Sequence, residues 1–539
     1  MKWVAQNPEQ AQVVGTEAEL TVVLGGAGVG KTTSALAAAA AHLDRVQDAK
    51  PHERVLFLSF SRASVGRIAS GTSEVLGKGA DRVDVMTFHS LAFSIVRRFG
   101  SMIGRGDVVL VSPAREKLGL ADNEIGYGSL LPLALEIARA SPAVAAHLRS
   151  RWGLVIVDEF QDTGDAQQQL LELITPSSRT ILLGDPNQCI YTFLVADGVR
   201  VERINEACAA AGQEHTIVLP QTSFRDPSGV IPAVANAIRT RQFDAPALAS
   251  AIEGGRLIVR SGIALSDEAS SVAKLVTELS SEGLGVAVFT HHNDMLASLS
   301  DALEAEGIEH EIAGLSDALA TALNAQVSMM QFRFGDASWE DVLESLAVFL
   351  TSAQRGAQVP VLATQILNGT GPQTLLARLT ALRGRLTDAV AVEAALGEAR
   401  AAHDALGLPQ KSGAWAQAGV LVAVMHARAS RQSRDQISTQ IVATISAEAR
   451  EAGYAALTDS VLSPREVQLM NLYQTKGREA DATIVVLREG DFMGKEVEPF
   501  PTTSRLLYVV FSRARQRIIV LLVGGTLHPA VAPLAQLVD

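Results

Sequence analysis

The chain has 539 residues, which is too many for one ordinary hydrophobic core, so several domains are expected. Hydrophobic residues make up 47% of the chain and charged residues 19%, a composition that is typical of globular proteins. The formal net charge of −12 excludes a broad positive surface for nucleic acid and confines any nucleic-acid contact to a local groove.

The composition also argues against a membrane protein, a secreted protein and a zinc protein. No run of 18 or more apolar residues occurs, so neither a transmembrane helix nor a membrane partner is expected. The first residues, MKWVAQNPEQ, lack the apolar segment of a signal peptide. The two cysteines, Cys189 and Cys208, do not form a disulfide framework and are too few for a structural zinc site, so the reducing cytoplasm is the expected location.

Two regions of the chain alternate between strand patterns and helix patterns. Each predicted strand is short, rich in Val, Ile and Leu, and ends near Gly, Ser or Asp, as buried parallel strands do. The helical patterns between them favour βαβ units and therefore an α/β fold. The predicted strands are 20–24, 54–60, 84–88, 153–159 and 179–185 in the first region, and 255–261, 285–291, 482–489 and 517–524 in the second.

Two further segments have helical periodicity throughout. Residues 89–150 and 313–462 are rich in Ala, Leu, Glu and Arg, with stretches such as SWEDVLESLAVFL. We predict that they are a smaller and a larger helical insertion. The predicted domains are therefore a first α/β domain of residues 1–88 and 151–220 and a second of residues 221–312 and 463–539.

The segment GGAGVGKT, residues 25–32, has the spacing of a phosphate-binding loop. Its glycines let backbone N–H groups turn toward phosphate oxygens, and the helix that follows adds donors at its N-terminus. Lys31 is expected to reach the β- and γ-phosphates, and Thr32 to bind Mg²⁺. The alternative is a plain glycine turn, but the apolar strand before the loop and the alanine-rich helix after it are the required context. The predicted nucleotide-binding residues here are Gly25, Gly26, Ala27, Gly28, Val29, Gly30, Lys31, Thr32 and Thr33.

The segment VIVDEFQD supplies two carboxylates at the end of a predicted strand. Ligands of α/β sheets bind at the carboxyl ends of strands, where Asp158 and Glu159 would lie. Asp158 is expected to hold Mg²⁺, and Glu159 to orient and deprotonate an attacking water. Taken alone, the pair could be a solvated turn. Together with the phosphate loop, adjacent carboxylates at a strand end favour nucleotide hydrolysis over phosphoryl transfer to another acceptor.

Several motifs together resemble the UvrD/Rep/PcrA family of superfamily 1 DNA helicases. The matching segments occur in the order of the family and fall in both α/β regions. The resemblance implies two RecA-like parallel-sheet motor domains, each with a helical insertion, and ATP bound in the cleft between them. The segments are QNPEQ, the phosphate loop, FLSFSRASVGRI, MTFHS, DEFQD, LLGDPNQCIYTF, TSFRDP, VQLMNLYQTKGREAD and RLLYVVFSRAR.

The resemblance assigns catalytic roles to three residues besides Lys31 and Glu159. Gln188, in GDPNQ, is expected to sense the γ-phosphate and hold the attacking water. Arg225 and Arg513 are expected to act from the second domain as arginine fingers. A guanidinium at this place neutralises the charge that develops on the equatorial oxygens in the transition state.

The resemblance also assigns contacts to the nucleoside. Gln10 is expected to read the adenine, and Glu479 to contact the ribose. Phe224 stands where the family has tyrosine and is expected to stack on the adenine, with a core phenylalanine as the alternative. Thr33 stands where many close relatives have an arginine beside the adenine, which predicts looser selectivity for the base.

A track for single-stranded DNA is expected across both motor domains. Such tracks stack bases on aromatic rings and add local positive charge without reading sequence. Packing in the core is the competing interpretation for each aromatic ring, and Arg62 and Arg67 are expected to touch phosphates. The predicted DNA-binding residues are Phe60, Arg62, His89, Tyr191, Phe193 and Tyr473.

The sequence thus favours an ATP-driven translocase and helicase on single-stranded DNA and on junctions of single- and double-stranded DNA. Its cofactors would be ATP and Mg²⁺, and its 3′→5′ polarity is implied by the resemblance. The alternative is a DNA-activated ATPase subunit that works with a nuclease partner in a repair or defence complex and unwinds little by itself. A scaffold that binds ATP without turnover is disfavoured, because the Asp158–Glu159 pair and both arginines are present.

Overall fold

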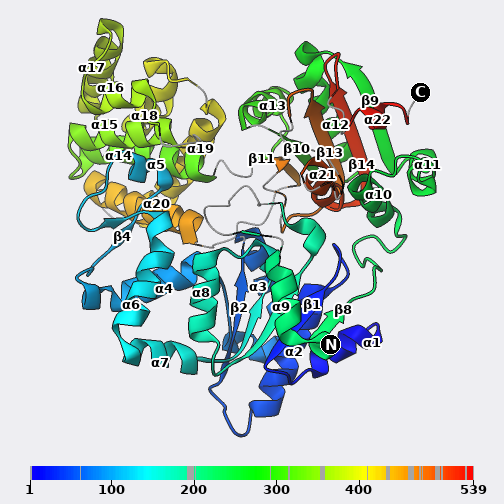
Figure 1. Ribbon diagram of the computed structural model, residues 1–539. Helices are drawn as coiled ribbons and strands as arrows, with labels where there is room; N and C mark the ends of the chain where they lie inside the picture. The colour runs from blue at the N-terminus through cyan, green and yellow to red at the C-terminus, as the bar shows by residue number, and fades with distance from the viewer. Residues whose placement is uncertain are drawn as a thin grey trace. The chain divides into compact units, whose positions relative to one another are not determined.

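The computed structural model describes the chain in two compact units (Figure 1). The first comprises Met1–Gly104, Leu130–Glu311 and Val461–Asp539, and the second comprises Arg105–Ser129 and Ile312–Ser460. The described residues are 3–60, 62–190, 199–200, 202–291, 293–312, 316–352, 358–409, 411–432, 437–458, 466–472, 475, 477–491, 498, 500, 502–527 and 531–537.

The first sheet has six parallel strands in the order β3-β2-β6-β7-β1-β8. All five strands predicted in this region are present. The sixth, β8, was not predicted, because it has only three residues and pairs at the edge, with Thr216 opposite Val22. The strands are β1 (Leu20–Leu24), β2 (Arg54–Ser59), β3 (Val83–Thr87), β6 (Trp152–Val157), β7 (Arg179–Gly184) and β8 (Thr216–Val218).

Helices pack around this sheet (Figure 1). The helix after the phosphate loop, α2, buries Ala35, Ala38 and Ala39, whose small side chains let its axis approach the strands closely. The helices are α1 (Pro8–Gly15), α2 (Lys31–Val46), α3 (Arg62–Leu76), α4 (Phe88–Phe99), α6 (Leu130–Ala140), α7 (Pro142–Ser150), α8 (Asp165–Ile174) and α9 (Glu202–Ala211).

The second sheet also has six strands, in the order β11-β12-β10-β13-β14-β9. The pairings from β12 to β9 are parallel, so the predicted α/β class with two RecA-like parallel sheets is confirmed. The strands are β9 (Leu257–Ile263), β10 (Val286–Thr290), β11 (Glu311–Ile312), β12 (Val467–Asn471), β13 (Ala480–Arg488) and β14 (Ala514–Val523). The helices of this part are α10 (Val230–Thr240), α11 (Pro246–Glu253), α12 (Glu268–Ser281), α13 (Asn293–Ala305), α21 (Thr503–Phe511) and α22 (Ala532–Ala535).

The second unit is helical and has its own core. Trp415 and Phe349 lie at its centre, with ring centroids 4.9 Å apart. Its elements are β4 (Val109–Leu110), α5 (Pro113–Lys117), β5 (Glu124–Ile125), α14 (Ser316–Phe334), α15 (Trp339–Thr351), α16 (Val361–Leu367), α17 (Gln373–Asp388), α18 (Val392–Leu406), α19 (Ser412–Gln432) and α20 (Ser438–Thr458).

The structure divides the smaller predicted insertion, residues 89–150, between the two units. Helices α4, α6 and α7 belong to the first unit, whereas Arg105–Ser129 belongs to the helical unit. The reason is specific contact: the Nε of Arg115 lies 2.8 Å from the Oε1 of Glu344 on α15, and Leu118 packs against the helical core. The predicted boundaries of this insertion therefore do not match the compact units.

Among the described helices, none is by itself long and apolar enough to cross a membrane. One bent pair, 127–140 and 142–150, reaches that length and composition only when both parts are taken together.

Lys411 closes the C-terminal end of α15. Its ammonium donates to the carbonyl oxygens of Phe349, Leu350 and Ser352 at 3.0, 3.0 and 2.6 Å. The last carbonyls of a helix lack the usual partner four residues on, although the Phe349 carbonyl also accepts from the backbone N–H of Ser352 at 3.2 Å, and a cation is favoured at this end of the helix dipole. Lys411→Met should therefore destabilise the helical unit by about 1–3 kcal/mol. Hydrogen exchange should speed up along α15, while the exposed-site control Lys274→Met leaves it unchanged; unaltered exchange in Lys411→Met would contradict this role.

Candidate functional site

The phosphate loop joins β1 to α2 and contains two positions whose backbone favours glycine. Gly28 and Gly30 have φ of +76° and +89°, in the left-handed region. A Cβ at Gly28 would lie 2.5 Å from the Oγ of Ser223, and one at Gly30 would lie 2.8 Å from the Nε2 of Gln10. At Gly28 and Gly30 the loop therefore has no room for a side chain, which suits a backbone cradle for phosphate.

Lys31 begins α2 and folds back over this cradle. Its Nζ donates to the carbonyl oxygens of Gly25 and Gly26, at 2.6 and 2.9 Å. These contacts hold the ammonium at the loop. A phosphate bound to the N–H groups of the loop would therefore meet this positive charge.

Thr32 and Asp158 provide adjacent oxygen ligands. The hydroxyl of Thr32 donates to the Oδ2 of Asp158 at 3.3 Å. Burial, together with the charge of Glu159, raises the pKa of the Asp158 carboxyl. Among the described residues, no group of three or more His, Cys, Asp or Glu could hold a metal. Mg²⁺ in ATPases needs only one or two protein ligands besides phosphate and water, so the Thr32–Asp158 pair fits it.

Glu159 is the second residue after β6 and has a strained backbone conformation, with φ of +54°. Its carboxylate accepts a hydrogen bond from the Nε2 of Gln161 at 2.6 Å. Gln161 was not predicted as a site residue, although it lies within the DEFQD segment. A carboxylate at the mouth of the phosphate loop and held by an amide can orient a water molecule and accept its proton.

Arg513 reaches Gln188 from the second sheet. Its Nη2 donates to the Oε1 of Gln188 at 2.7 Å, and both side chains are buried. Burial, with the charge of Arg225, lowers the pKa of Arg513 to about 10, so the group is still a cation at neutral pH. The structure thus brings together two residues that are 325 positions apart in the chain.

Arg225 is held by Glu479 and by a backbone carbonyl. Its Nη2 lies 2.5 Å from the Oε1 of Glu479, and its Nη1 donates to the oxygen of Ser512. Arg67 and Arg515 also contact the Glu479 carboxylate, at 3.3 and 3.2 Å. Burial alone would raise the pKa of Glu479, but Arg225, Arg67 and Arg515 outweigh it and lower the pKa to about 2.

This cluster contains two residues with predicted ligand contacts. The Glu479 carboxylate lies against three guanidinium groups and lines the nucleotide cavity, so its contact with the ribose stays a prediction. The Arg67 guanidinium faces Glu479, and its contact with a DNA phosphate also stays a prediction. Both positions follow from electrostatics, because a buried carboxylate needs opposite charge nearby.

Gln10 and Phe224 lie beside Gly30 and are the residues predicted to contact the adenine. Gln10 is buried, and its Oε1 accepts from the backbone N–H of Gln6 at 2.9 Å. Phe224 is 47% exposed, and its ring would contact a Cβ at Gly30, at 3.3 Å. Exposure excludes the alternative of a core phenylalanine and leaves the ring available for stacking. Thr33 is also exposed here.

The predicted nucleotide residues, apart from Gly25 and Gly26, share the walls of one cavity of about 630 Å³. Gly25 and Gly26 line a second cavity of about 650 Å³ together with Tyr508. Sequence reasoning missed three further residues of the first cavity. The missed residues are Trp3, Gln6 and Arg515.

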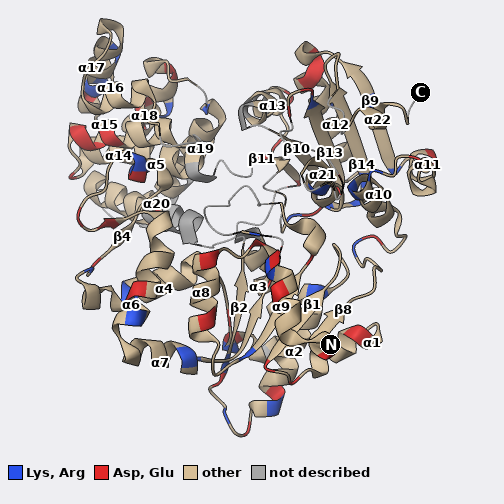
Figure 2. Cartoon of the chain, viewed as in Figure 1, with Lys and Arg blue, Asp and Glu red and all other residues tan. Residues whose placement is uncertain are grey.

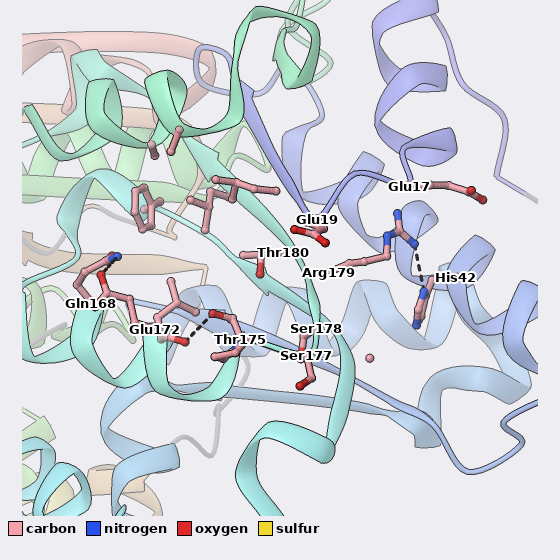
Figure 3. Close-up of a pocket in the computed structure, with 18 of the residues that line it drawn as sticks. Glu17, Glu19, His42, Gln168, Glu172, Thr175, Ser177, Ser178, Arg179 and Thr180 are labelled. Carbon is pink, nitrogen blue, oxygen red and sulfur yellow. Dashed lines mark hydrogen bonds between the residues drawn. The ribbon is translucent and has the colours of Figure 1, made fainter. Parts of the chain in front are cut away.

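A larger depression of about 1170 Å³ lies elsewhere on the first sheet (Figure 3). Glu17, His42 and Arg179 line it. Many of its charged groups are paired with one another, as in Arg45–Glu17 and Lys50–Glu53. No part of the phosphate loop contributes to its described walls, so it is not the nucleotide site.

Few of the predicted DNA contacts fall where the structure describes side chains. Phe60 and His89 are half-buried, at the end of β2 and the start of α4. Tyr191, Phe193 and Tyr473, and the side chain of Arg62, lie outside the described residues. In the part of the chain that is described, Figure 2 shows basic and acidic residues interspersed along the helices that pack around the first sheet.

Phe224 gives a direct test of the nucleoside end of the cavity. Phe224→Ala should raise the KM for ATP about 10-fold with little change in kcat, because a stacked base is worth about 1–3 kcal/mol. Steady-state kinetics over a range of ATP concentrations measures both values. Phe243→Ala, at a ring that contacts Arg241 away from the cavity, is the control. An unchanged KM in Phe224→Ala would show that the ring does not touch the base.

Comparison with known proteins confirms the resemblance seen in the motifs. Residues 6–122 and 116–208 match the UvrD/REP helicase N-terminal domain. The chain is 25% identical over 296 residues to the ATP-dependent DNA helicase PcrA of Leuconostoc citreum, covering 43% of this chain and 38% of that protein.

Two further similar proteins have names that combine helicase and nuclease terms. The chain is 26% identical to an ATP-dependent helicase/nuclease subunit of Streptococcus pneumoniae over 162 residues, 29% of this chain and 13% of that protein. It is 30% identical to the exonuclease/helicase subunit RexA of Lactococcus lactis subsp. cremoris over 111 residues, 20% of this chain and 9% of that protein. The chain thus covers less than two fifths of the length of each of these three relatives.

Proposed function

We propose that this chain, which carries a UvrD/REP helicase N-terminal domain, is an ATP-dependent motor that moves along single-stranded DNA. One observation carries the proposal: a single cavity combines the phosphate loop and Glu159 of the first sheet with Arg513 of the second. Because hydrolysis needs groups from both domains, the state of the nucleotide is coupled to the distance between the two domains.

The phosphate loop and Lys31 bind the ATP phosphates. The N–H groups of the loop point toward phosphate oxygens, and the Lys31 ammonium neutralises their charge. Thr32 and Asp158 would hold Mg²⁺, which when bound supplies positive charge to the β- and γ-phosphates. Gln10 and Phe224 would hold the adenine.

Glu159 and Gln188 act on the water. Gln188 orients the water molecule. Glu159 accepts a proton from this water while the water oxygen forms a bond to the γ-phosphorus. The bond from that phosphorus to the bridging oxygen breaks, and ADP leaves with the electron pair. Arg225 and Arg513 neutralise the charge on the transferring group. Arg225 can act only after it exchanges the Glu479 carboxylate for phosphate oxygens, because the carboxylate now occupies its Nη2.

We propose unwinding with 3′→5′ polarity as the finer form of this activity, with ATP and Mg²⁺ as cofactors and single-stranded DNA and its junctions as partners. The support is the order of the motifs and the similarity to a protein named as an ATP-dependent DNA helicase. The cytoplasm remains the expected location.

A second candidate is a DNA-activated ATPase subunit that acts with a nuclease partner. Two similar proteins are named as helicase/nuclease or exonuclease/helicase subunits, which favours this candidate. Strand displacement by the purified chain, on a duplex with a 3′ tail, separates the two. Processive unwinding without a partner supports the helicase, whereas DNA-stimulated ATP hydrolysis without unwinding supports the second candidate. If DNA does not stimulate hydrolysis, both are contradicted.

A further inference from the structure

A buried amide connects the water-activating carboxylate to the next strand. Gln161 lies in a short turn, η4 (Phe160–Asp162), and is fully buried. Its Nε2 donates to the Oε2 of Glu159 at 2.6 Å, and its Oε1 accepts from the backbone N–H of Asp185 at 3.1 Å. Because one end is a donor and the other an acceptor, these two bonds fix the orientation of the amide.

Asp185 carries the connection to the second sheet. Its Oδ2 accepts from the Nε2 of Gln188 at 2.9 Å and from the hydroxyl of Tyr508 at 3.2 Å. Its Oδ1 accepts from the backbone N–H of Asn187 at 2.9 Å. Asp185 therefore binds both the residue expected to sense the γ-phosphate and a residue of α21.

Tyr508 is a donor in this arrangement. It is 7% exposed, and burial, with the charge of Asp185, raises the pKa of its phenol well above its usual range. The hydroxyl therefore keeps its proton at any working pH. Its oxygen would also lie 3.5 Å from a Cβ at Gly26, so it stands close to the phosphate loop.

These contacts connect α21 to Glu159 through Asp185, which accepts from Tyr508 with its carboxylate and donates to Gln161 with its backbone N–H. The described walls of the nucleotide cavity include Glu159 but neither Gln161 nor Tyr508, whereas Tyr508 lines the second cavity with Gly25 and Gly26. The role of both residues is argued from their hydrogen bonds to Glu159 and Asp185. Glu159 itself has a strained backbone, so its carboxylate depends on neighbours for a fixed direction.

We propose that Gln161 and Tyr508 are positioning residues of a relay, Tyr508–Asp185–Gln161–Glu159, that aligns the water-activating carboxylate when α21 packs against the first domain. The inference rests on the proposed ATPase function. It explains how the second domain affects proton transfer as well as the charge on the phosphate. When α21 moves away, Asp185 loses the Tyr508 bond, and the amide that orients Glu159 is held less firmly.

The test is a double-mutant cycle on the full chain, read out as DNA-stimulated ATP hydrolysis. Gln161→Met keeps the volume of the side chain and removes both hydrogen bonds, and Tyr508→Phe removes one buried hydroxyl. Loss of a hydrogen bond to a charged group should lower kcat about 10- to 100-fold in Gln161→Met. The loss of kcat in Tyr508→Phe should be smaller. The KM for ATP should stay constant in both variants. Gln169→Met, at an exposed glutamine that contacts Arg139, is the matched control.

The relay predicts that the double variant is no slower than Gln161→Met alone, because either change breaks the same chain. Losses in kcat that multiply, or an unchanged kcat in Tyr508→Phe, would overturn it. A purely structural role would lower the melting temperature and leave kcat per folded molecule unchanged, which would also overturn it. If Gln161→Met does not fold, the kcat of Tyr508→Phe decides alone. A wild-type chain without DNA-stimulated hydrolysis would overturn the proposed function and the relay together.

Discussion

Lys31→Ala should reduce ATP hydrolysis to background, with and without single-stranded DNA. The Lys31 ammonium is held at the phosphate loop by the carbonyls of Gly25 and Gly26. The loop contains no second cation that could neutralise the β- and γ-phosphates. Loss of one charge that acts directly on the transferring group costs at least about 10²- to 10³-fold in rate.

A matched control separates this effect from a general loss of positive charge. Lys50→Ala removes an exposed lysine of the same domain, which pairs with Glu53 at 2.8 Å. Its turnover should equal that of the wild type. Phosphate release measured for both variants at saturating ATP gives the comparison. DNA-stimulated turnover by Lys31→Ala at a rate close to wild type would refute the assignment of the phosphate site.

Arg225→Ala and Arg513→Ala should each lower kcat by about 10³-fold while ATP affinity changes little. An arginine finger acts on charge that develops in the transition state, so its removal is seen in kcat rather than in ground-state binding. Both guanidinium groups line the nucleotide cavity. Arg225 also contacts Glu479, and Arg513 also contacts Gln188.

Measurements of nucleotide affinity and of turnover, made on the same preparations, test this prediction. Arg517→Ala is the control, because Arg517 lies on the same part of the second sheet but pairs with Glu282 at 3.1 Å. A large loss of affinity with an unchanged kcat would mean that Arg225 and Arg513 hold the ground state or support the fold.

The strands could be predicted because they are apolar runs between turn residues. β7 (Arg179–Gly184) and β14 (Ala514–Val523) contain the buried apolar runs ILL and IIVLLV. β8 was missed because three residues give no periodic signal. β12 (Val467–Asn471) was noticed only as part of a motif, because Gln468 and Asn471 interrupt its apolar pattern although both are buried.

The nucleotide site could be predicted where a motif states both residue type and spacing. The phosphate loop is one continuous segment, so its chemistry is visible in the sequence. Gln161, Asp185 and Tyr508 are different. Tyr508 and Asp185, which are in contact, are 323 positions apart in the chain. No local pattern encodes that contact, and the same holds for the three arginines on Glu479.

Trp3 shows a further limit. It lines the nucleotide cavity although it precedes every recognised motif. A single aromatic residue near the start of a chain has no spacing that distinguishes a binding role from packing. Trp3 lies beside the cavity because of the path that the chain takes before α1. Secondary-structure propensities do not predict that path.

Translocation along single strands tests the central proposal most directly. Oligothymidylates of increasing length, labelled at the 5′ end, report when a bound molecule arrives after ATP is added. We expect a delay that grows in proportion to length, appears only with a 5′ label, and is absent in Lys31→Ala. A delay that does not depend on length, in a chain that still hydrolyses ATP on DNA, would contradict movement along the strand.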